Sequence, residues 1–233
     1  MRTIRGKKGP FSERPYYTQE EIEEICSGEL KRAGLYPVAP GPVRIERFIE
    51  KRFGVSPSYE ELPEGVLAYT GFDSHGVQKV VISTKLVEHE NQVSERRLNA
   101  TLAHEAGHGL LHAHLFVVVS QGELPFGEAA GKNKVKVLCR EESIAVQSGY
   151  DGRWWEYQAN RAIGSLLLPK SLVGEALKPL LAARGSLGRF FLSEEKREAA
   201  GRSIATVFEV NPVVARIRIA ELYPKENEEQ LTL

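Results

Sequence analysis

The sequence contains few of the residues on which disulfide-rich, membrane and nucleic-acid-binding proteins depend. Its only cysteines are Cys26 and Cys139, too few for a disulfide framework or a four-cysteine zinc cluster. Its 31 basic residues balance its 31 acidic residues, so no net charge favours direct binding to nucleic acid or to a membrane surface. The longest apolar stretch, about residues 110–119, is too short to cross a bilayer, and residues 1–15 lack the apolar core of a secretory signal. We therefore expect a soluble cytoplasmic protein with free thiols.

Two further scarcities limit the chemistry that the chain can perform. Met1 is the only methionine, and only Asp73 and Asp151 among the 31 acidic residues are aspartates, so carboxylate chemistry falls to glutamate. Hydrophobic residues make up 42% of the chain and charged residues 27%, which is typical of a globular protein and excludes wholesale disorder. The length suits one substantial core with a small appendage, and nothing in the sequence indicates an oligomeric state.

Hydrophobic periodicity divides the chain into an arm, a main domain and a tail. Residues 1–16 are polar and basic and predict a flexible arm, whereas residues 17–190 combine helical periodicity with a β-hairpin at 65–84. Residues 117–152 form a long irregular insertion with one strand-like run, a candidate lid over a cleft. Residues 191–233 predict a helical segment, so the whole pattern indicates an α+β fold.

Local signals predict where the helices begin and end. Thr18 and Glu21 form a capping box for a helix that ends at Gly34, and Asn211 followed by a proline predicts the start of a helix in the tail. The tail is expected to hold two or three short helices. The remaining helices are expected at residues 43–53, 94–115, 153–168 and 169–183.

One motif, at residues 102–109, carries a specific chemistry. It reads Leu-Ala-His-Glu-Ala-Gly-His-Gly and contains H-E-x-x-H as His104, Glu105 and His108. Helical positions four apart are offset by about 40° around the axis and about 6 Å along it, so both imidazoles can bind one cation. Zinc suits two neutral imidazoles with a carboxylate and retains a position for water. Glu105 can reach that water without binding the metal and act as a general base.

Three residues are candidates for the third metal ligand, and two of them fit poorly. His114 has the metzincin spacing, but Leu111 replaces the glycine of that pattern and Met1 cannot form the Met-turn. His112 continues the helical face of His104 about 12 Å further along the axis, too far for both to bind an ion with bonds of about 2.0–2.1 Å. We expect His112 at the rim of the site, as a transition-state donor or a surface histidine.

The third candidate, Glu156, lies on a separate helix and is the best ligand by elimination. Asn160 lies one turn further along the same face of that helix. Its side-chain oxygen can accept the free N–H of a metal-bound histidine and fix the tautomer of the ring. The sequence therefore predicts one Zn²⁺ per chain, bound by His104, His108 and Glu156.

Two blocks of the chain, residues 102–112 and 156–169, resemble the ImmA/IrrE family of metallo-endopeptidases. The family combines H-E-x-G-H with E-x-Q-A-N-x-F-A-x-x-L-L-x-P, and the second block here reads Glu-Tyr-Gln-Ala-Asn-Arg-Ala-Ile-Gly-Ser-Leu-Leu-Leu-Pro. The chain departs from the family at Ile163 and Gly164, where Phe-Ala is usual, and in the length of the insertion. The resemblance implies a zincin-like, gluzincin-type fold with a small β-sheet packed on the helix that carries H-E-x-x-H.

The resemblance also implies a function. Family members cleave or help to inactivate helix-turn-helix repressors in mobile-element induction or stress responses, and residues 203–218 are similar to the family's helix-turn-helix-like segment. We therefore expect a zinc-dependent endopeptidase that acts on a protein substrate, with Glu105 as the base. His112, His114 and Tyr157 are candidates for stabilising the carbonyl oxygen. The alternative is a non-hydrolytic zinc-containing module that binds a repressor or antitoxin.

Overall fold

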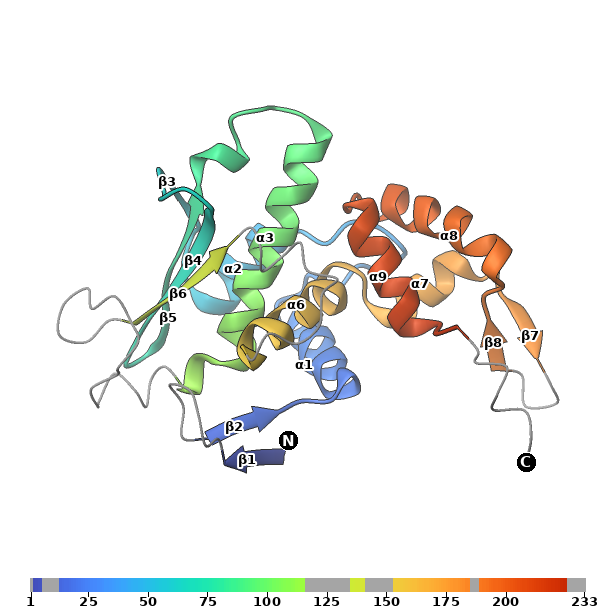
Figure 1. Ribbon diagram of the computed structural model, residues 1–233, viewed down its shortest axis with the longest axis horizontal. Helices are drawn as coiled ribbons and strands as arrows, with labels where there is room; N and C mark the ends of the chain where they lie inside the picture. The colour runs from blue at the N-terminus through green and yellow to red at the C-terminus, as the bar shows by residue number, and fades with distance from the viewer. Residues whose placement is uncertain (1, 6–12, 116–134, 141–152, 185–188, 226–233) are drawn as a thin grey trace.

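The computed structural model describes residues 2–5, 13–115, 135–140, 153–184 and 189–225. The α-helices in these ranges are α1 (Gln19–Arg32), α2 (Ile45–Phe53), α3 (Gln92–Leu111), α6 (Trp154–Leu167), α7 (Lys170–Leu177), α8 (Glu194–Val207) and α9 (Pro212–Leu222), and a short 3-10 helix, η1, spans Thr84–Leu86. The strands are β1 (Arg2–Arg5), β2 (Glu13–Tyr16), β3 (Ser58–Glu60), β4 (Val66–Asp73), β5 (Gly76–Ser83), β6 (Val135–Arg140), β7 (Ala182–Arg184) and β8 (Arg189–Phe191). This mixture confirms the predicted α+β class (Figure 1).

A four-stranded mixed sheet forms one side of the molecule, with the strand order β3-β5-β4-β6. The predicted hairpin at residues 65–84 is confirmed as β4 and β5, which pair antiparallel. β6 pairs antiparallel with the other side of β4, and the short β3 runs parallel to β5. β4 is therefore an inner strand and β6 is the edge strand on its side of the sheet.

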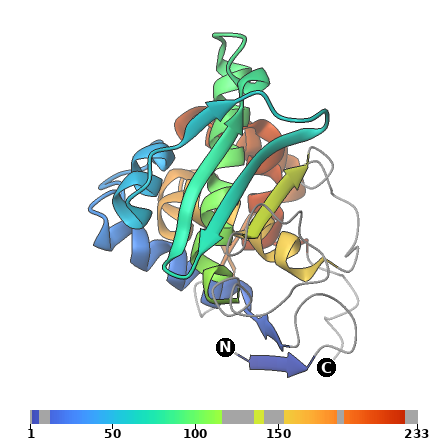
Figure 2. The same ribbon diagram turned by 90° about the vertical axis from the view of Figure 1, so that its left-hand side faces the viewer.

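Helix α3 crosses one face of this sheet, behind the strands in the view of Figure 2. Its N-cap is Asn91, whose side-chain oxygen accepts the backbone N–H of Ser94 at 2.9 Å. Every residue from Ala100 to Gly109 is buried, because α3 lies between the sheet and α6 and contacts both. The H-E-x-x-H motif thus lies in the fully buried stretch of α3.

The predicted helix ends are largely confirmed. The Thr18 hydroxyl accepts the N–H of Glu21 and the Glu21 carboxylate accepts the N–H of Thr18, as a capping box requires. The predicted helix over residues 169–183 is wrong in its length, because α7 ends at Leu177 and residues 182–184 form β7. Lys178 precedes a proline, which disfavours helical backbone at Lys178 and removes a donor from the next turn.

The two ends of the described chain pack against the central helices. Within the segment predicted as an arm, β1 and β2 pair antiparallel, and the carbonyl of Pro15 accepts a hydrogen bond from Gln158 on α6 at 2.9 Å. The tail forms two helices, α8 and α9, and the N-cap of α9 is Asn211 as predicted. α9 packs on α6, and α8 packs on α7.

The prediction of a lid falls largely outside the described residues. Of the candidate lid at residues 117–152, only the strand β6 is described, and the rest of the lid prediction lies outside the described residues.

Among the helices that the structure describes, none is both long and apolar enough to cross a membrane.

Candidate metal centre

The centre is built where α3 and α6 pack closely against each other. A Cβ atom added at Gly107 would lie 2.9 Å from Cβ of Ala162 and 3.1 Å from the carbonyl oxygen of Ala159. Glycine at position 107, facing the small side chains of Ala159 and Ala162, permits this spacing. The short spacing brings Glu156 of α6 up to the histidines of α3.

His104, His108 and Glu156 converge on one buried point. Nε2 of His104 lies 3.1 Å from Nε2 of His108 and 3.2 Å from Oε2 of Glu156, and Nε2 of His108 lies 3.5 Å from Oε1 of Glu156. A tetrahedral ion with bonds of about 2.0–2.1 Å separates its ligand atoms by about 3.3–3.4 Å. The three side chains therefore fit one small metal ion, and this buried cluster could hold one.

A hydrogen bond fixes the tautomer of His104. Nδ1 of His104 lies 2.9 Å from the amide oxygen of Asn160. An amide oxygen can only accept, so Nδ1 carries the ring proton and Nε2 presents its lone pair to the centre.

A longer chain of hydrogen bonds fixes the tautomer of His108. The amide of Gln158 donates from Nε2 to the carbonyl of Pro15, so its oxygen faces Nε2 of His112 at 3.0 Å. His112 then carries its proton on Nε2 and accepts through Nδ1 from Nδ1 of His108, 3.1 Å away. Nε2 of His108 therefore also presents a lone pair to the centre.

These assignments bring two imidazole lone pairs and a carboxylate together with no donor between them, an arrangement that a cation stabilises. Burial opposes charge on the His104 ring, but Cys139 and Glu156 raise its pKa well above the ordinary value. Burial likewise opposes charge on Glu156, but the two histidines lower the pKa of that carboxyl well below its ordinary value. Without a metal the centre therefore attracts a proton, and metal binding displaces that proton.

Glu105 lies beside the three ligand candidates and contacts the neighbouring strand β4. It is buried, and its Oε2 accepts a hydrogen bond from the hydroxyl of Thr70 on β4. Its Oε1 has no hydrogen-bond partner among the residues that the structure describes. Burial raises the pKa of this carboxyl, although His104, His108 and Thr70 oppose the rise. One carboxylate oxygen is thus held in place and the other is free to accept a proton.

The expectation for His112 is wrong, because this residue is neither at the rim nor on the surface. It is fully buried, and its ring meets Trp154 edge-on at a centroid distance of 5.6 Å. Burial and the neighbouring His108 lower the pKa of His112 to about 3, so the ring stays neutral and can accept a hydrogen bond. Of the other two candidates for the carbonyl oxygen, His114 is exposed and Tyr157 is half-exposed.

Sequence reasoning missed three residues that contact this centre. Thr70 and Cys139 lie on strands, and only the pairing register of the sheet could have assigned them to it. Gln158 stands in the motif block of α6, but its role depends on the carbonyl of Pro15, which is far away in the sequence.

The chain matches no protein-family model, and no curated protein matches it significantly. The functional argument therefore depends on the geometry of the centre and on the motifs that form it.

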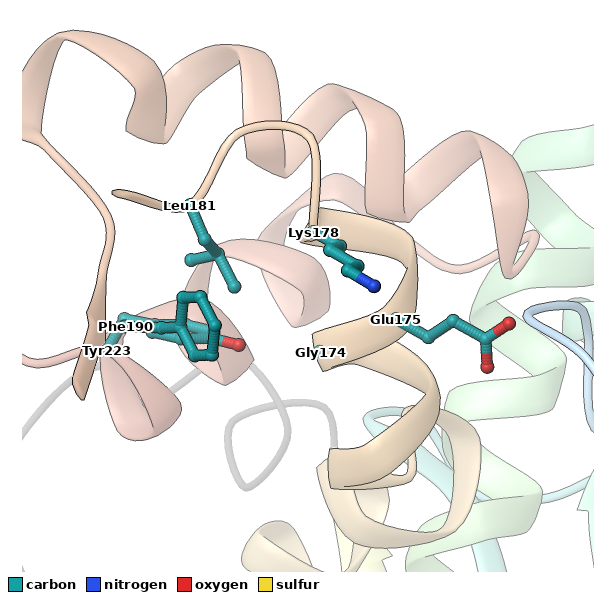
Figure 3. Close-up of a pocket in the computed structure, with 6 residues that line it drawn as sticks. All are labelled: Gly174, Glu175, Lys178, Leu181, Phe190 and Tyr223. Atoms are coloured by element: carbon teal, nitrogen blue, oxygen red, sulfur yellow. The ribbon is translucent and has the colours of Figure 1, made fainter. Parts of the chain in front are cut away.

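A separate surface hollow carries no comparable chemistry (Figure 3). Leu181, Phe190 and Tyr223 gather at one side of it, and Glu175 of α7 and the C-cap residue Lys178 line the other. Phe190 is 60% exposed, and none of the lining residues belongs to the metal cluster.

Proposed function

We propose that the protein is a zinc-dependent metallo-endopeptidase of the zincin type. The observation that carries the proposal is the tetrahedral spacing of His104, His108 and Glu156 beside Glu105, whose Oε1 is free. Two imidazoles and one carboxylate are a typical donor set for catalytic zinc, which keeps one position open. The resemblance to the ImmA/IrrE family supports the same assignment.

The chain's own residues would supply the proton transfers of peptide hydrolysis. Zinc, when bound, lowers the pKa of a coordinated water and polarises the scissile carbonyl. Thr70 holds Oε2 of Glu105, so Oε1 is oriented to take the proton of the attacking water. Glu105 then delivers this proton to the leaving amine. Burial raises the pKa of Glu105, which favours a group that must both accept and return a proton.

The edge strand β6 is the best place for an extended substrate. β4 is paired on both sides, whereas β6 ends the sheet in the described part of the chain and carries Cys139 beside the centre. A peptide added antiparallel or parallel to β6 would gain main-chain hydrogen bonds next to the candidate metal. We propose that the substrate is a helix-turn-helix repressor, on the strength of the family resemblance.

The decisive experiment replaces Glu105 by Gln in the full chain. The Glu105→Gln variant is expected to keep one zinc per chain by elemental analysis and to lose repressor cleavage by at least about 100-fold. The substrate offered in this assay is whatever regulator the neighbouring gene encodes. Glu95→Gln, on an exposed position of the same helix, is the matched control and should cleave as the wild type does.

Two outcomes would contradict the proposal. Undiminished cleavage by Glu105→Gln would remove Glu105 from its role as the base. Equal binding of the repressor by wild type and variant, with zinc bound and no cleavage by either, would favour the non-hydrolytic binding module.

A further inference from the structure

Trp155 precedes the candidate ligand Glu156 on α6 and has no role in the proposed mechanism. It is only partly buried, and it packs against the fully buried ring of Phe72 on β4. Val77 of β5 and Ala113, which follows α3, pack against the same ring. The indole of Trp155 therefore spans from α6 to the sheet, next to the metal centre.

A row of aromatic rings in edge-on contact holds this indole in place. The ring of Trp155 meets that of Trp154 at a centroid distance of 5.7 Å and an interplanar angle of 87°. The ring of Trp154 meets that of His112 at 5.6 Å and 79°. Edge-to-face pairs at such distances are attractive beyond the area that they bury. Trp154 and His112 are buried, so Trp155 is the partly exposed end of a fixed row of rings.

The sheet register relates this indole to a peptide bound along β6. Phe72 is the register partner of Val135 on β6, and Thr70 is the partner of Val137. Residues two apart on β4 share a face, and on this face Thr70 donates its hydrogen bond to Glu105. A peptide paired with β6 adds one residue to each of these rows, and residues in one row direct their side chains to the same face. The peptide residue in the row of Phe72 therefore lies two positions, or about 7 Å, from the one beside Glu105.

We infer that Trp155, backed by Phe72, is the wall of a substrate subsite that takes a large apolar side chain. This inference rests on the proposed function and on a substrate antiparallel to β6, the more stable of the two pairings. In that direction the side chain belongs to one of the first three residues after the scissile bond. Burying such a side chain against the indole is favourable, whereas a charged one would lose its hydration and gain no partner from Phe72, Val77 or Ala113.

Mapping the cleavage sites of the zinc-loaded wild type tests the position and the preference. The substrates are the regulator encoded by the neighbouring gene and a peptide library made by tryptic digestion of a denatured proteome. Mass spectrometry of the new termini locates each cleaved bond. We expect leucine, isoleucine, methionine and phenylalanine to be enriched at one of the three positions after the scissile bond, and aspartate and glutamate to be depleted there.

Two synthetic peptides then connect this preference to Trp155. They carry the best cleaved sequence and differ only in leucine or alanine at the enriched position. The wild type should cleave the leucine peptide with a kcat/KM at least about tenfold higher, and Trp155→Ala should discriminate by less than about threefold. Trp155→Phe, which keeps an aromatic ring, should give an intermediate ratio. Tyr59→Ala is the matched control, because it removes a 39% exposed ring from β3, at the opposite edge of the same sheet, and should keep the wild-type ratio.

Each failure has a distinct meaning. Cleavage by the wild type without an apolar preference at those positions would overturn the subsite and leave the proposed function standing. An unchanged ratio in Trp155→Ala, or in Trp155→Phe should the alanine variant not fold, would show that the indole only packs against Phe72. Absence of cleavage of both substrates by the zinc-loaded wild type would overturn the proposed function together with the subsite.

Discussion

At the scale of single residues, the hydrogen bonds behind the ligand candidates decide what the centre can bind. The ring of His112 touches neither Glu156 nor Nε2 of His104, yet it determines which nitrogen of His108 keeps its lone pair. The amide of Gln158, anchored on a main-chain carbonyl, gives this chain of hydrogen bonds its direction. A neutral histidine thus positions a ligand without contacting the metal.

Replacing His112 by leucine tests this role, because leucine fills the space without accepting a hydrogen bond. We expect zinc affinity to fall by about 10–100-fold, since the proton of His108 is no longer held on Nδ1. Competition with a chromogenic zinc chelator measures the change. His114→Leu, two residues away and exposed, should bind zinc as the wild type does. Unaltered affinity in His112→Leu would show that the ring only fills space.

At the scale of helices and strands, the motif spacing predicted the cluster but not its surroundings. His104, Glu105 and His108 share a helix, so the 3.6-residue repeat alone places them together, and Glu156 and Asn160 follow the same rule on α6. The same rule placed His112 too far from the metal for direct binding. It could not show that α6 covers this end of α3, and therefore it assigned a buried residue to the rim.

Strand and helix boundaries show the same division between local and distant causes. The capping box at Thr18 and the hairpin at residues 65–84 depend on neighbouring residues and were predicted from them. The assignment of Cys139 to the centre depends on the pairing of β6 with β4, two strands far apart in the chain. Periodicity contains no information on that pairing.

Replacing Gly107 by alanine tests the contact between α3 and α6. The added methyl group would meet Cβ of Ala162 at 2.9 Å and main-chain atoms of Ala159 at 3.1–3.2 Å, so the helices must move apart. We expect a loss of about 1–3 kcal/mol in the free energy of unfolding. Weaker zinc binding should accompany this loss, because Glu156 moves with α6.

Gly28→Ala on α1 is the matched control for this substitution. Its Cβ would meet nothing within 4 Å, and alanine favours a helix over glycine by about 0.5–1 kcal/mol. In urea, Gly28→Ala should therefore be as stable as the wild type or slightly more stable. In chelator competition it should bind zinc as the wild type does. Equal behaviour of the two variants would show that the close approach of α3 and α6 is not required.

At the scale of the whole molecule, a buried arginine joins the C-terminal helices to the part that holds the centre. Arg218 of α9 is fully buried, and its Nε donates to the carbonyl of Leu168 at 3.0 Å. Its guanidinium also donates to Glu23 of α1 and to Glu221 of α9. Gly164 makes room for it, since a Cβ there would lie 3.1 Å from Cδ of Arg218. Glycine at position 164 therefore leaves space for the stem of Arg218.

Replacing Arg218 by methionine should therefore destabilise the whole molecule and not only its tail. The substitution keeps much of the apolar stem but removes the donor of the Leu168 carbonyl and the buried guanidinium that pairs with Glu23 and Glu221, which keep only the Lys170 N–H and Arg161 as partners among the described residues. We expect a loss of about 3 kcal/mol. Arg216→Met, at an exposed position of the same helix, should change stability by less than about 0.5 kcal/mol. A single cooperative unfolding transition, shifted in Arg218→Met and unshifted in Arg216→Met, is the expected result in urea. Two separate transitions in the wild type would show that α8 and α9 unfold independently, and the arginine would then stabilise only their docking.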